Sequence, residues 1–217
     1  MMYNEKKQWK ADPNGRQIME RKSYISSDHT KHALAAALKE LMVQKPLDKI
    51  TIQELTNRCG MRRQNFYYHF EDVYDLLRWL FQEEAVSLLR QHEGALLWQD
   101  GLLQLYEYLE ENREFCLCAL KSVGRDHIRR FVEADIHAII HRTVDQIGAE
   151  IGALETECKA DIDLITHFYV MALAGMTESW LIGQVDRTPQ QLIAFADQLL
   201  QDHVRGAKMR LAGAAEE

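Results

Sequence analysis

Residues 60–70 read GMRRQNFYYHF and crowd charged, polar and aromatic side chains into one short segment. Phe66 and Phe70 are four residues apart, so a helix places them on the same face. The arginine, glutamine, asparagine, tyrosine and histidine side chains of the segment must then point elsewhere. We therefore expect a short helix that two phenylalanines anchor and that presents a row of polar groups to a partner.

The residues before this segment predict a second short helix and a tight turn. Thr51, with Glu54 three residues later, has the pattern of a capping box at a helix start. Gly60 ends that helix where a left-handed backbone conformation costs little. Two short helices joined by a glycine turn are the sequence form of a helix-turn-helix, whose second helix enters the major groove of DNA. Arginine suits guanine, and glutamine and asparagine suit adenine.

The composition indicates an all-α fold with an ample core. The 217 residues are 47% hydrophobic and include only three prolines and eleven glycines, which suits long, rarely interrupted helices. No apolar run approaches the roughly 18 residues that a membrane span needs, and the start MMYNEKKQWK has no hydrophobic signal segment behind it. We expect a cytoplasmic protein with no membrane partner.

Charge and cysteine content narrow the function classes. Residues 1–90 carry a net charge of +3 and residues 91–217 a net charge of −10, which predicts a small anion-binding module on an acidic body. The four cysteines lack CxxC spacing, as reduced structural residues do: Cys59, Cys116, Cys118 and Cys158. We expect no metal and no cofactor.

The pattern along the chain predicts about nine helices in four parts. These are a flexible basic arm (1–27), a helix-turn-helix domain (28–72), a helical regulatory and dimerisation domain (73–206) and a flexible tail (207–217). Ser27 or Asp28 is expected to cap the first helix, and Met19 is an alternative start of the chain. The basic residues of the arm could enter the minor groove, although disorder without function is the favoured interpretation: Lys6, Lys7, Lys10, Arg16, Arg21 and Lys22.

Individual helices are predicted from apolar spacing and capping patterns. The first buries Leu34, Leu38, Leu41 and Met42, and a fourth runs from Asp72 to about Leu88. Thr188, Pro189 and Gln191 predict a capped start for the last helix. Helices are expected near 101–112, 114–122, 127–150, 161–183 and 188–205.

At residues 50–77 the sequence, ITIQELTNRCGMRRQNFYYHFEDVYDLL, resembles the DNA-binding segment of TetR-family transcriptional regulators. Residues 60–81, GMRRQNFYYHFEDVYDLLRWLF, are similar to the subgroup of dihydroxyacetone kinase regulators. The resemblance implies three N-terminal helices that read DNA and a C-terminal helical body for dimerisation and ligand binding. It also implies that the protein is not an enzyme.

The resemblance assigns DNA contacts residue by residue. It makes Arg63 and Gln64 the main base readers, with Tyr67 at the groove floor and Gln53 reaching from the preceding helix. Arg62 contacts a base or a phosphate, and the remaining phosphate contacts are Thr51, Asn65, Tyr68 and His69. The family usually has a phosphate-binding lysine where this chain has Val73, so phosphate anchoring is reduced or supplied by Lys31 or Lys49.

In the body, the resemblance implies that the helices near 161–183 and 188–205 form a four-helix bundle with a second subunit, so the operator is palindromic. Ala172, Ala174 and Gly175 allow close helix approach, and the apolar surface comes from Ile165, Tyr169, Met176, Leu192, Phe195, Leu199 and Leu200. The alternative is that these residues only fill the core.

The regulatory signal is open at this stage. Phe168, Met171, Trp180 and Tyr106, together with scattered histidines, suggest a mostly apolar ligand pocket for an unknown effector. Regulation by a protein coactivator on the acidic body is an alternative, and both repressor and activator are open. A further alternative is a helical adaptor that has lost autonomous DNA binding.

His137 and His141, four residues apart, have the spacing of a zinc-binding pair, but no third ligand is evident nearby. We interpret them as core or pocket-lining histidines. The remote alternative is a small helical metal-dependent enzyme that also uses Asp135 and Asp145.

Overall fold

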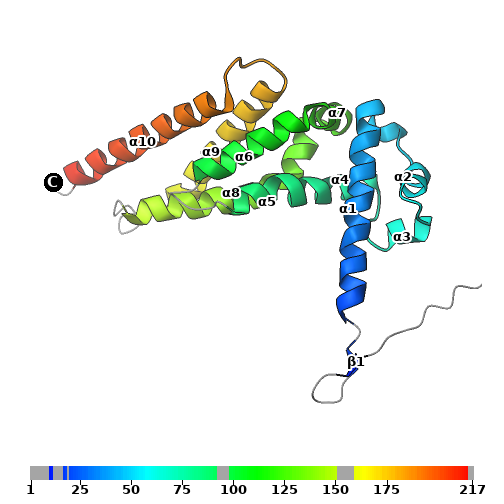
Figure 1. Cartoon of the computed structure of the whole chain (residues 1–217). Coiled ribbons are helices and arrows are strands. Elements are labelled where there is room, and N and C mark those ends of the chain that lie inside the picture. Colours follow the sequence, from blue (N-terminus) through cyan, green and yellow to red (C-terminus); the bar gives the residue numbers. More distant parts are fainter. Residues whose placement is uncertain (1–9, 12–16, 19, 92–97, 151–158, 215–217) are drawn as a thin grey trace, which may run out of the picture.

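The computed structural model describes residues 10–11, 17–18, 20–91, 98–150 and 159–214 (Figure 1). The N-terminal helices are α1 (Glu20–Gln44), the 3₁₀ helix η1 (Leu47–Lys49), α2 (Ile52–Arg58), α3 (Arg63–Tyr67) and α4 (Val73–Leu80). A π-helix, η2 (Phe81–Val86), continues α4 into α5 (Ser87–Gln91). The body adds α6 (Trp98–Glu111), α7 (Arg113–Val123), α8 (Arg125–Glu150), α9 (Lys159–Leu181) and α10 (Pro189–Ala214).

The predicted all-α class is confirmed. If α4, η2 and α5 are counted as one continuous helix, the described residues contain nine helices besides the three-residue 3₁₀ helix η1. Within the same residues, the β structure is a pair of two-residue antiparallel strands in the predicted arm, β1 (Lys10–Ala11) and β2 (Gln17–Ile18). In the described residues no helix is both long and apolar enough to cross a membrane.

Two predicted helix ends are wrong. α1 begins at Glu20, so neither Ser27 nor Asp28 caps it and the boundary placed at residue 28 falls inside the helix. No proline or glycine lies between Glu20 and Gln44 to stop the helix earlier. α10 continues to Ala214, because residues 207–212 are mostly good helix formers, so most of the predicted flexible tail is helical.

One hydrophobic core joins the N-terminal helices to the body. The predicted inward positions of α1, Leu34, Leu38, Leu41 and Met42, are all buried. The core cluster runs on through α4, η2, α6 and α7 to Ile193 in α10. Figure 1 shows α2 and α3 beside α1 at one end, with the long helices of the body extending away from it. Because the packing is continuous, the two predicted domains share a core.

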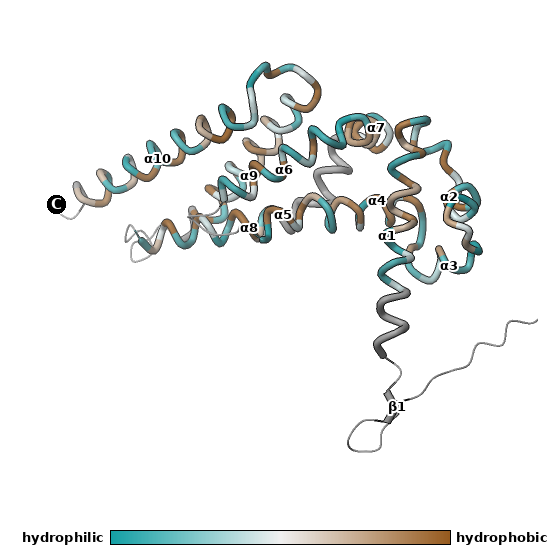
Figure 2. Tube along the Cα trace, in the orientation of Figure 1, coloured by the Kyte–Doolittle hydropathy of each residue, from teal (hydrophilic) through white to brown (hydrophobic). Residues whose placement is uncertain are grey.

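The last two helices alternate in hydropathy along their length (Figure 2). Thr188 caps α10 as predicted: its hydroxyl accepts a hydrogen bond from the amide of Gln191 (3.3 Å), and its own amide donates to the side-chain oxygen of Gln191 (3.1 Å). Of the predicted interface residues, Leu192 is buried in the core, whereas Phe195 and Leu199 are exposed. α10 therefore has one face in the body and one apolar stripe outside it.

Candidate nucleic-acid interface

The scaffold of the candidate site is the pair α2 and α3. The capping box is confirmed: the Thr51 hydroxyl accepts a hydrogen bond from the amide of Glu54 (3.2 Å), and the amide of Thr51 donates to Glu54 Oε2 (3.0 Å). The turn is also confirmed, because Gly60 has φ +63°, in the left-handed region that favours glycine. These local features set where α2 ends and where α3 can start.

α3 presents its polar side chains outward, as the phenylalanine spacing predicts. Phe66 is fully buried and Phe70 nearly so, and their ring centroids are 5.8 Å apart. Most of the predicted DNA-contacting residues are exposed: Thr51, Gln53, Arg62, Arg63, Gln64, Asn65, Tyr67 and Tyr68. His69 is half-buried. The nine predicted residues therefore lie on α2, α3 and their ends, at one end of the molecule, and buried Phe66 and Phe70 anchor α3 beneath them.

Some of these side chains are oriented by neighbours. The guanidinium of Arg63 donates to the hydroxyl of Tyr67 (3.4 Å), and the Gln53 amide donates to Asn57 Oδ1 (2.6 Å). The rings of Tyr68 and His69 meet edge to face at 4.8 Å. Asn57 was not singled out from the sequence, although its position four residues after Gln53 on a helix would place the two on one face.

The start of α2 carries a charged cluster. The sequence predicted its capping box, Thr51 with Glu54, but not the ion pair of Glu54 with Lys45. Lys45 Nζ lies 2.5 Å from Glu54 Oε1, and this contact, followed by hydrogen bonds from Thr51, lowers the pKa of Glu54 from 4.5 to about 2. The carboxylate therefore stabilises the cap above about pH 4.5, and this contribution is lost as the pH falls toward 2. The Thr51 hydroxyl also donates to Glu54 Oε2 (2.9 Å), so it serves the cap.

The position of the expected family lysine is unsuited to any phosphate contact. Val73 is only 8% exposed and belongs to the core. Of the two suggested replacements, Lys49 lies 3.4 Å from Asp48. Lys31 lies with its Nζ 5.6 Å from the centroid of the Trp79 ring. Burial, and after it the charge of Lys31, lowers the pKa of His69.

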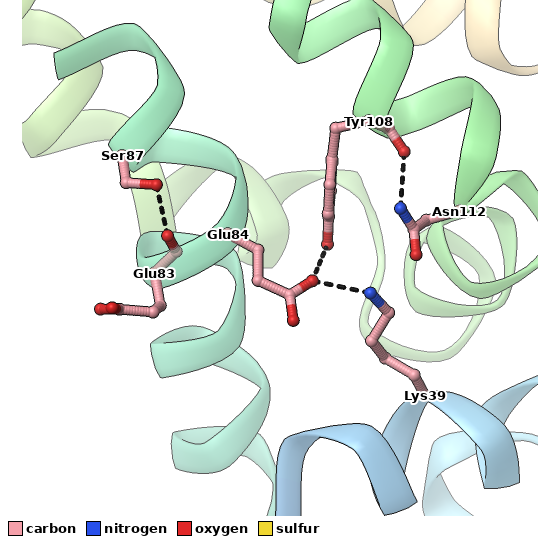
Figure 3. Close-up of polar contacts among 6 residues, drawn as sticks. All are labelled: Lys39, Glu83, Glu84, Ser87, Tyr108 and Asn112. Carbon is pink, nitrogen blue, oxygen red and sulfur yellow. Dashed lines mark hydrogen bonds and ion pairs between the residues drawn. The ribbon is translucent and has the colours of Figure 1, made fainter. Parts of the chain in front are cut away.

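Behind the interface, a polar junction links α1 to the body (Figure 3). Glu84 of η2 accepts on one oxygen, Oε2, both from Lys39 Nζ of α1 (2.7 Å) and from the Tyr108 hydroxyl of α6 (2.9 Å). Burial, and then the adjacent carboxylate of Glu84, raises the pKa of Tyr108. Lys39 also lies over the rings of Tyr108 and Phe115, at 5.3 and 5.8 Å from their centroids.

A second contact ties the end of α1 to α7. The amide of Leu47 donates to the Ser122 hydroxyl (3.1 Å), and the Cys118 thiol lies 3.7 Å from the carbonyl oxygen of Lys45. Cys59, Cys116 and Cys118 are free, as predicted, and Cys158 lies outside the described residues. The segment Lys39–Leu47, which runs from α1 to the start of η1, is therefore attached to the body at both of its ends.

The body contains a mostly apolar cavity of about 480 Å³ between η2, α6, α8, α9 and α10. Phe168 and Met171 line it, whereas His137 and His141 do not. Its polar lining includes Thr143, Tyr169, Thr177, Glu178 and His203.

Tyr106 and Trp180 lie outside the cavity wall. Tyr106 is buried, its hydroxyl lies 3.2 Å from the Thr177 hydroxyl, and its ring meets that of Trp180 edge to face at 4.9 Å. They pack the core beside the cavity.

The histidine pair forms no metal site in the described part of the chain. The rings of His137 and His141 are 6.0 Å apart, and His141 Nε2 lies 3.1 Å from Asp163 Oδ1. Asp145 is exposed, and the side chain of Asp135 lies outside the described residues. Wherever side chains are described, no three histidine, cysteine or carboxylate groups gather as metal ligands would.

α9 and α10 leave a broad apolar surface uncovered. Its large side chains include Leu164, Ile165, Phe168, Met171, Phe195 and Leu199. The ring of Phe168 lies 6.2 Å from that of His203, and the Tyr169 hydroxyl lies 2.7 Å from His203 Nδ1, so the two helices adjoin at this point. Exposed apolar surface of this extent is typical of protein interfaces.

Comparison with known proteins adds to this geometry. Residues 97–202 match the family model described as a transcriptional regulator C-terminal region. The chain is 33% identical over 86 residues to the HTH-type dhaKLM operon transcriptional activator DhaS of Lactococcus lactis subsp. lactis strain IL1403. That match covers 40% of this chain and 46% of the relative, so the similarity spans about half of the relative's length.

Solved structures share the fold over most of the chain. The dihydroxyacetone kinase operon activator DhaS superposes with a TM-score of 0.62 at 22% identity, over 81% of this chain and 96% of that one. A transcriptional regulator from Pseudomonas aeruginosa PAO1 gives 0.66 at 16% identity, over 88% and 98%. NalD, the secondary repressor of the MexAB-OprM multidrug efflux pump in Pseudomonas aeruginosa, gives 0.53 at 15% identity, over 85% and 96%.

Proposed function

We propose that the chain is a transcriptional regulator of the TetR family: a homodimeric, sequence-specific DNA-binding protein whose operator affinity responds to a signal at the helical body. The observation that carries this proposal is α3, which holds its polar side chains outward on a base of buried Phe66 and Phe70. In a helix-turn-helix this is the face that enters the major groove.

Within that face, Arg63 and Gln64 read bases, Gln53 reaches in from α2, and Tyr67 lies at the groove floor. Arginine forks onto guanine O6 and N7, and glutamine pairs with adenine N6 and N7. Asn65, Tyr68 and His69 bind phosphates, and Arg62 binds a base or a phosphate. Thr51 joins the phosphate contacts by turning its hydroxyl proton from Glu54 to the DNA. The hydrogen bond from Arg63 to Tyr67 holds the guanidinium in place before DNA arrives.

Replacing Arg63 by alanine should cost about 1–3 kcal/mol of operator binding and relax discrimination at one base position. We would measure fluorescence anisotropy on DNA from upstream of the gene and its neighbours, against scrambled DNA, at two salt concentrations. Wild type should bind the upstream DNA more tightly, with a steep salt dependence.

His69→Ala is the matched comparison, since it should weaken all sequences alike. Equal losses for Arg63→Ala on upstream and scrambled DNA would refute base reading by Arg63. Wild-type binding that is indifferent to sequence would overturn the proposed function and favour an adaptor or a partner-dependent regulator.

Dimerisation through α9 and α10 is the second part of the proposal. The exposed apolar surface of the two helices supports it, and the exposed Ala172 and Gly175 permit close helix approach. A two-fold dimer would present two copies of α3 about 34–36 Å apart, so we expect a palindromic operator.

The signal enters, in this proposal, through the cavity of the body. Phe81, Ala85 and Val86 of η2 line the cavity, while Glu84 of the same π-helix holds Lys39 of α1. An effector that displaces η2 would therefore alter the position of α1. The mostly apolar lining favours an apolar molecule over a small polar triose such as dihydroxyacetone.

The relatives suggest which genes are controlled and in what direction. The curated relative and one of the solved structures both carry the name DhaS, and the structure is described as a dihydroxyacetone kinase operon activator. We therefore propose a link to dihydroxyacetone or glycerol metabolism and favour activation over repression. Activation through a protein coactivator on the body fits the same geometry, because it needs a partner surface in addition to DNA reading.

Glu84→Gln should weaken operator binding about 2- to 30-fold, because loss of the carboxylate loosens the hold of the body on α1. Glu83→Gln is the matched control: Glu83 is its exposed neighbour in the same π-helix, and its carboxylate points away from Lys39 in Figure 3. Anisotropy titrations and thermal unfolding of both variants would separate coupling from stability. Identical affinities for the two variants would argue against transmission through this junction.

A further inference from the structure

Lys31 occupies a position where an apolar residue would be expected. It lies three residues before Leu34 and seven before Leu38, so a helix places it on the same side as these buried residues. Lys31 is nevertheless a cation, and it is half-buried. A lysine at this position on the stripe needs a reason other than core packing.

The ammonium of Lys31 is held by an aromatic ring and has no carboxylate beside it. Its Nζ lies 5.6 Å from the centroid of Trp79 in α4, within the range of a cation–π contact. Trp79 is fixed in turn by Phe70 (5.7 Å) and by His32 (5.2 Å). The nearby carboxylate of Asp28 pairs with His32, at 3.6 Å.

Neighbouring lysines differ in this respect. Lys39 pairs with Glu84, Lys45 with Glu54 and Lys49 with Asp48. Among the four lysines of residues 27–50, Lys31 is the one for which the described residues supply no carboxylate partner. Its positive charge is therefore available to an anion from outside the chain.

A chain of ring contacts links Lys31 to the residues that follow α3: Trp79, under the ammonium, meets Phe70 at 5.7 Å, and Phe70 meets His69 at 6.2 Å. Burial, and after it the positive charge of Lys31, lowers the pKa of His69. His69 in turn meets the ring of Tyr68, which is 79% exposed. The ammonium of α1, the imidazole and the phenol thus converge beside the C-terminal end of the candidate reading helix.

We propose that Lys31 anchors a DNA backbone phosphate at the C-terminal end of α3, together with His69 and Tyr68. This inference rests on the proposed function, because it assumes that α3 enters the major groove. In it, Lys31 supplies the charge, His69 donates from a neutral ring, and the Tyr68 hydroxyl donates a second hydrogen bond. The ring of Trp79 positions the Lys31 ammonium before DNA binds. Lys31 would thus supply the phosphate contact for which the resemblance expects a lysine at the position of Val73.

The test is Lys31→Met, which keeps an apolar stem against Trp79 and removes the charge. Affinity for a random-sequence duplex and for the upstream DNA would be measured between about 50 and 200 mM salt. A dimer loses two phosphate contacts, so the slope of log K against log salt should become shallower by about 1.8. Over this fourfold salt range, wild type should lose about twelvefold more affinity than the variant.

Lys121→Met is the matched control, because it removes the same charge from an exposed site on α7 of the body. It should leave the slope unchanged, and Lys31→Arg should keep most of it. A Lys31→Met slope equal to that of wild type and Lys121→Met would overturn the anchor. A wild-type chain that binds neither duplex would overturn the proposed function itself.

Titration of His69 by NMR supplies a readout that needs no DNA. In Lys31→Met the His69 ring should titrate at higher pH than in wild type, since a nearby positive charge is gone. An unchanged His69 titration would show that Lys31 does not lie against this ring and would contradict the proposed site. Thermal unfolding of each variant would verify that the fold is retained.

Discussion

Replacing Phe195 by glutamate should separate the proposed dimer into monomers and weaken operator binding about 10²- to 10⁴-fold. Phe195 is 53% exposed on α10, although it is a large apolar residue. Two copies of α3 bound to one palindrome act as a bivalent ligand, so loss of the dimer removes the gain in effective concentration. A carboxylate buried in an apolar interface is also costly unless it is paired.

Sedimentation and anisotropy titrations would check this expectation. Phe168→Glu on α9 should have the same effect, because Phe168 is 56% exposed on the adjoining helix. Gln190→Glu is the control, since it adds the same charge to α10 on a different side of the helix from Leu199. If both phenylalanine variants remain dimeric, the dimer interface lies elsewhere on the chain.

The parts of the fold that were predictable from sequence are those set by neighbouring residues. The capping boxes at Thr51 and Thr188, the turn at Gly60 and the buried pair Phe66 and Phe70 all depend on spacings of a few residues. These features can be predicted from the sequence because each interaction joins residues that are only a few positions apart. The exposed face of α3 follows from the same spacings, and its DNA contacts remain a proposal.

The helix ends were less predictable, because a helix can continue past a residue that would make a good cap when the residues beyond it also favour a helix. Ser27 and Asp28 are good caps, but the helix-compatible residues before them extend α1 to Glu20. The π-helix η2 has no local signature in FQEEAV, and it interrupts what periodicity predicts as one regular helix from Asp72 to about Leu88.

The junction and the cavity depend on contacts between distant segments. Lys39 and Glu84 are 45 residues apart, and Glu84 and Tyr108 are 24 apart, so no spacing rule could pair them. His137 and His141 were considered for the pocket because their spacing is helical, yet α8 turns them away from the cavity. Sequence periodicity identifies a shared face but cannot tell which neighbour that face meets.

Replacing Phe66 by alanine should lower the free energy of unfolding by about 3–5 kcal/mol. Phe66 is fully buried in the core cluster, where its ring contacts Phe70 at 5.8 Å and Tyr67 at 5.8 Å. Truncation leaves a cavity under α3, which has only five residues and depends on this anchor for its position. Most of the stability of so short a helix comes from tertiary packing.

Because the core cluster is continuous from α1 to α10, we expect one cooperative transition whose midpoint falls by about 6–20 °C. Calorimetry at a fixed chain concentration would measure it, since the stability of a dimer depends on concentration. Tyr68→Ala, on the exposed face two residues later, should change the midpoint little while weakening DNA binding. An equal midpoint for Phe66→Ala and wild type would mean that α3 is not held by this ring, and the outward direction of Arg63 would then need another cause.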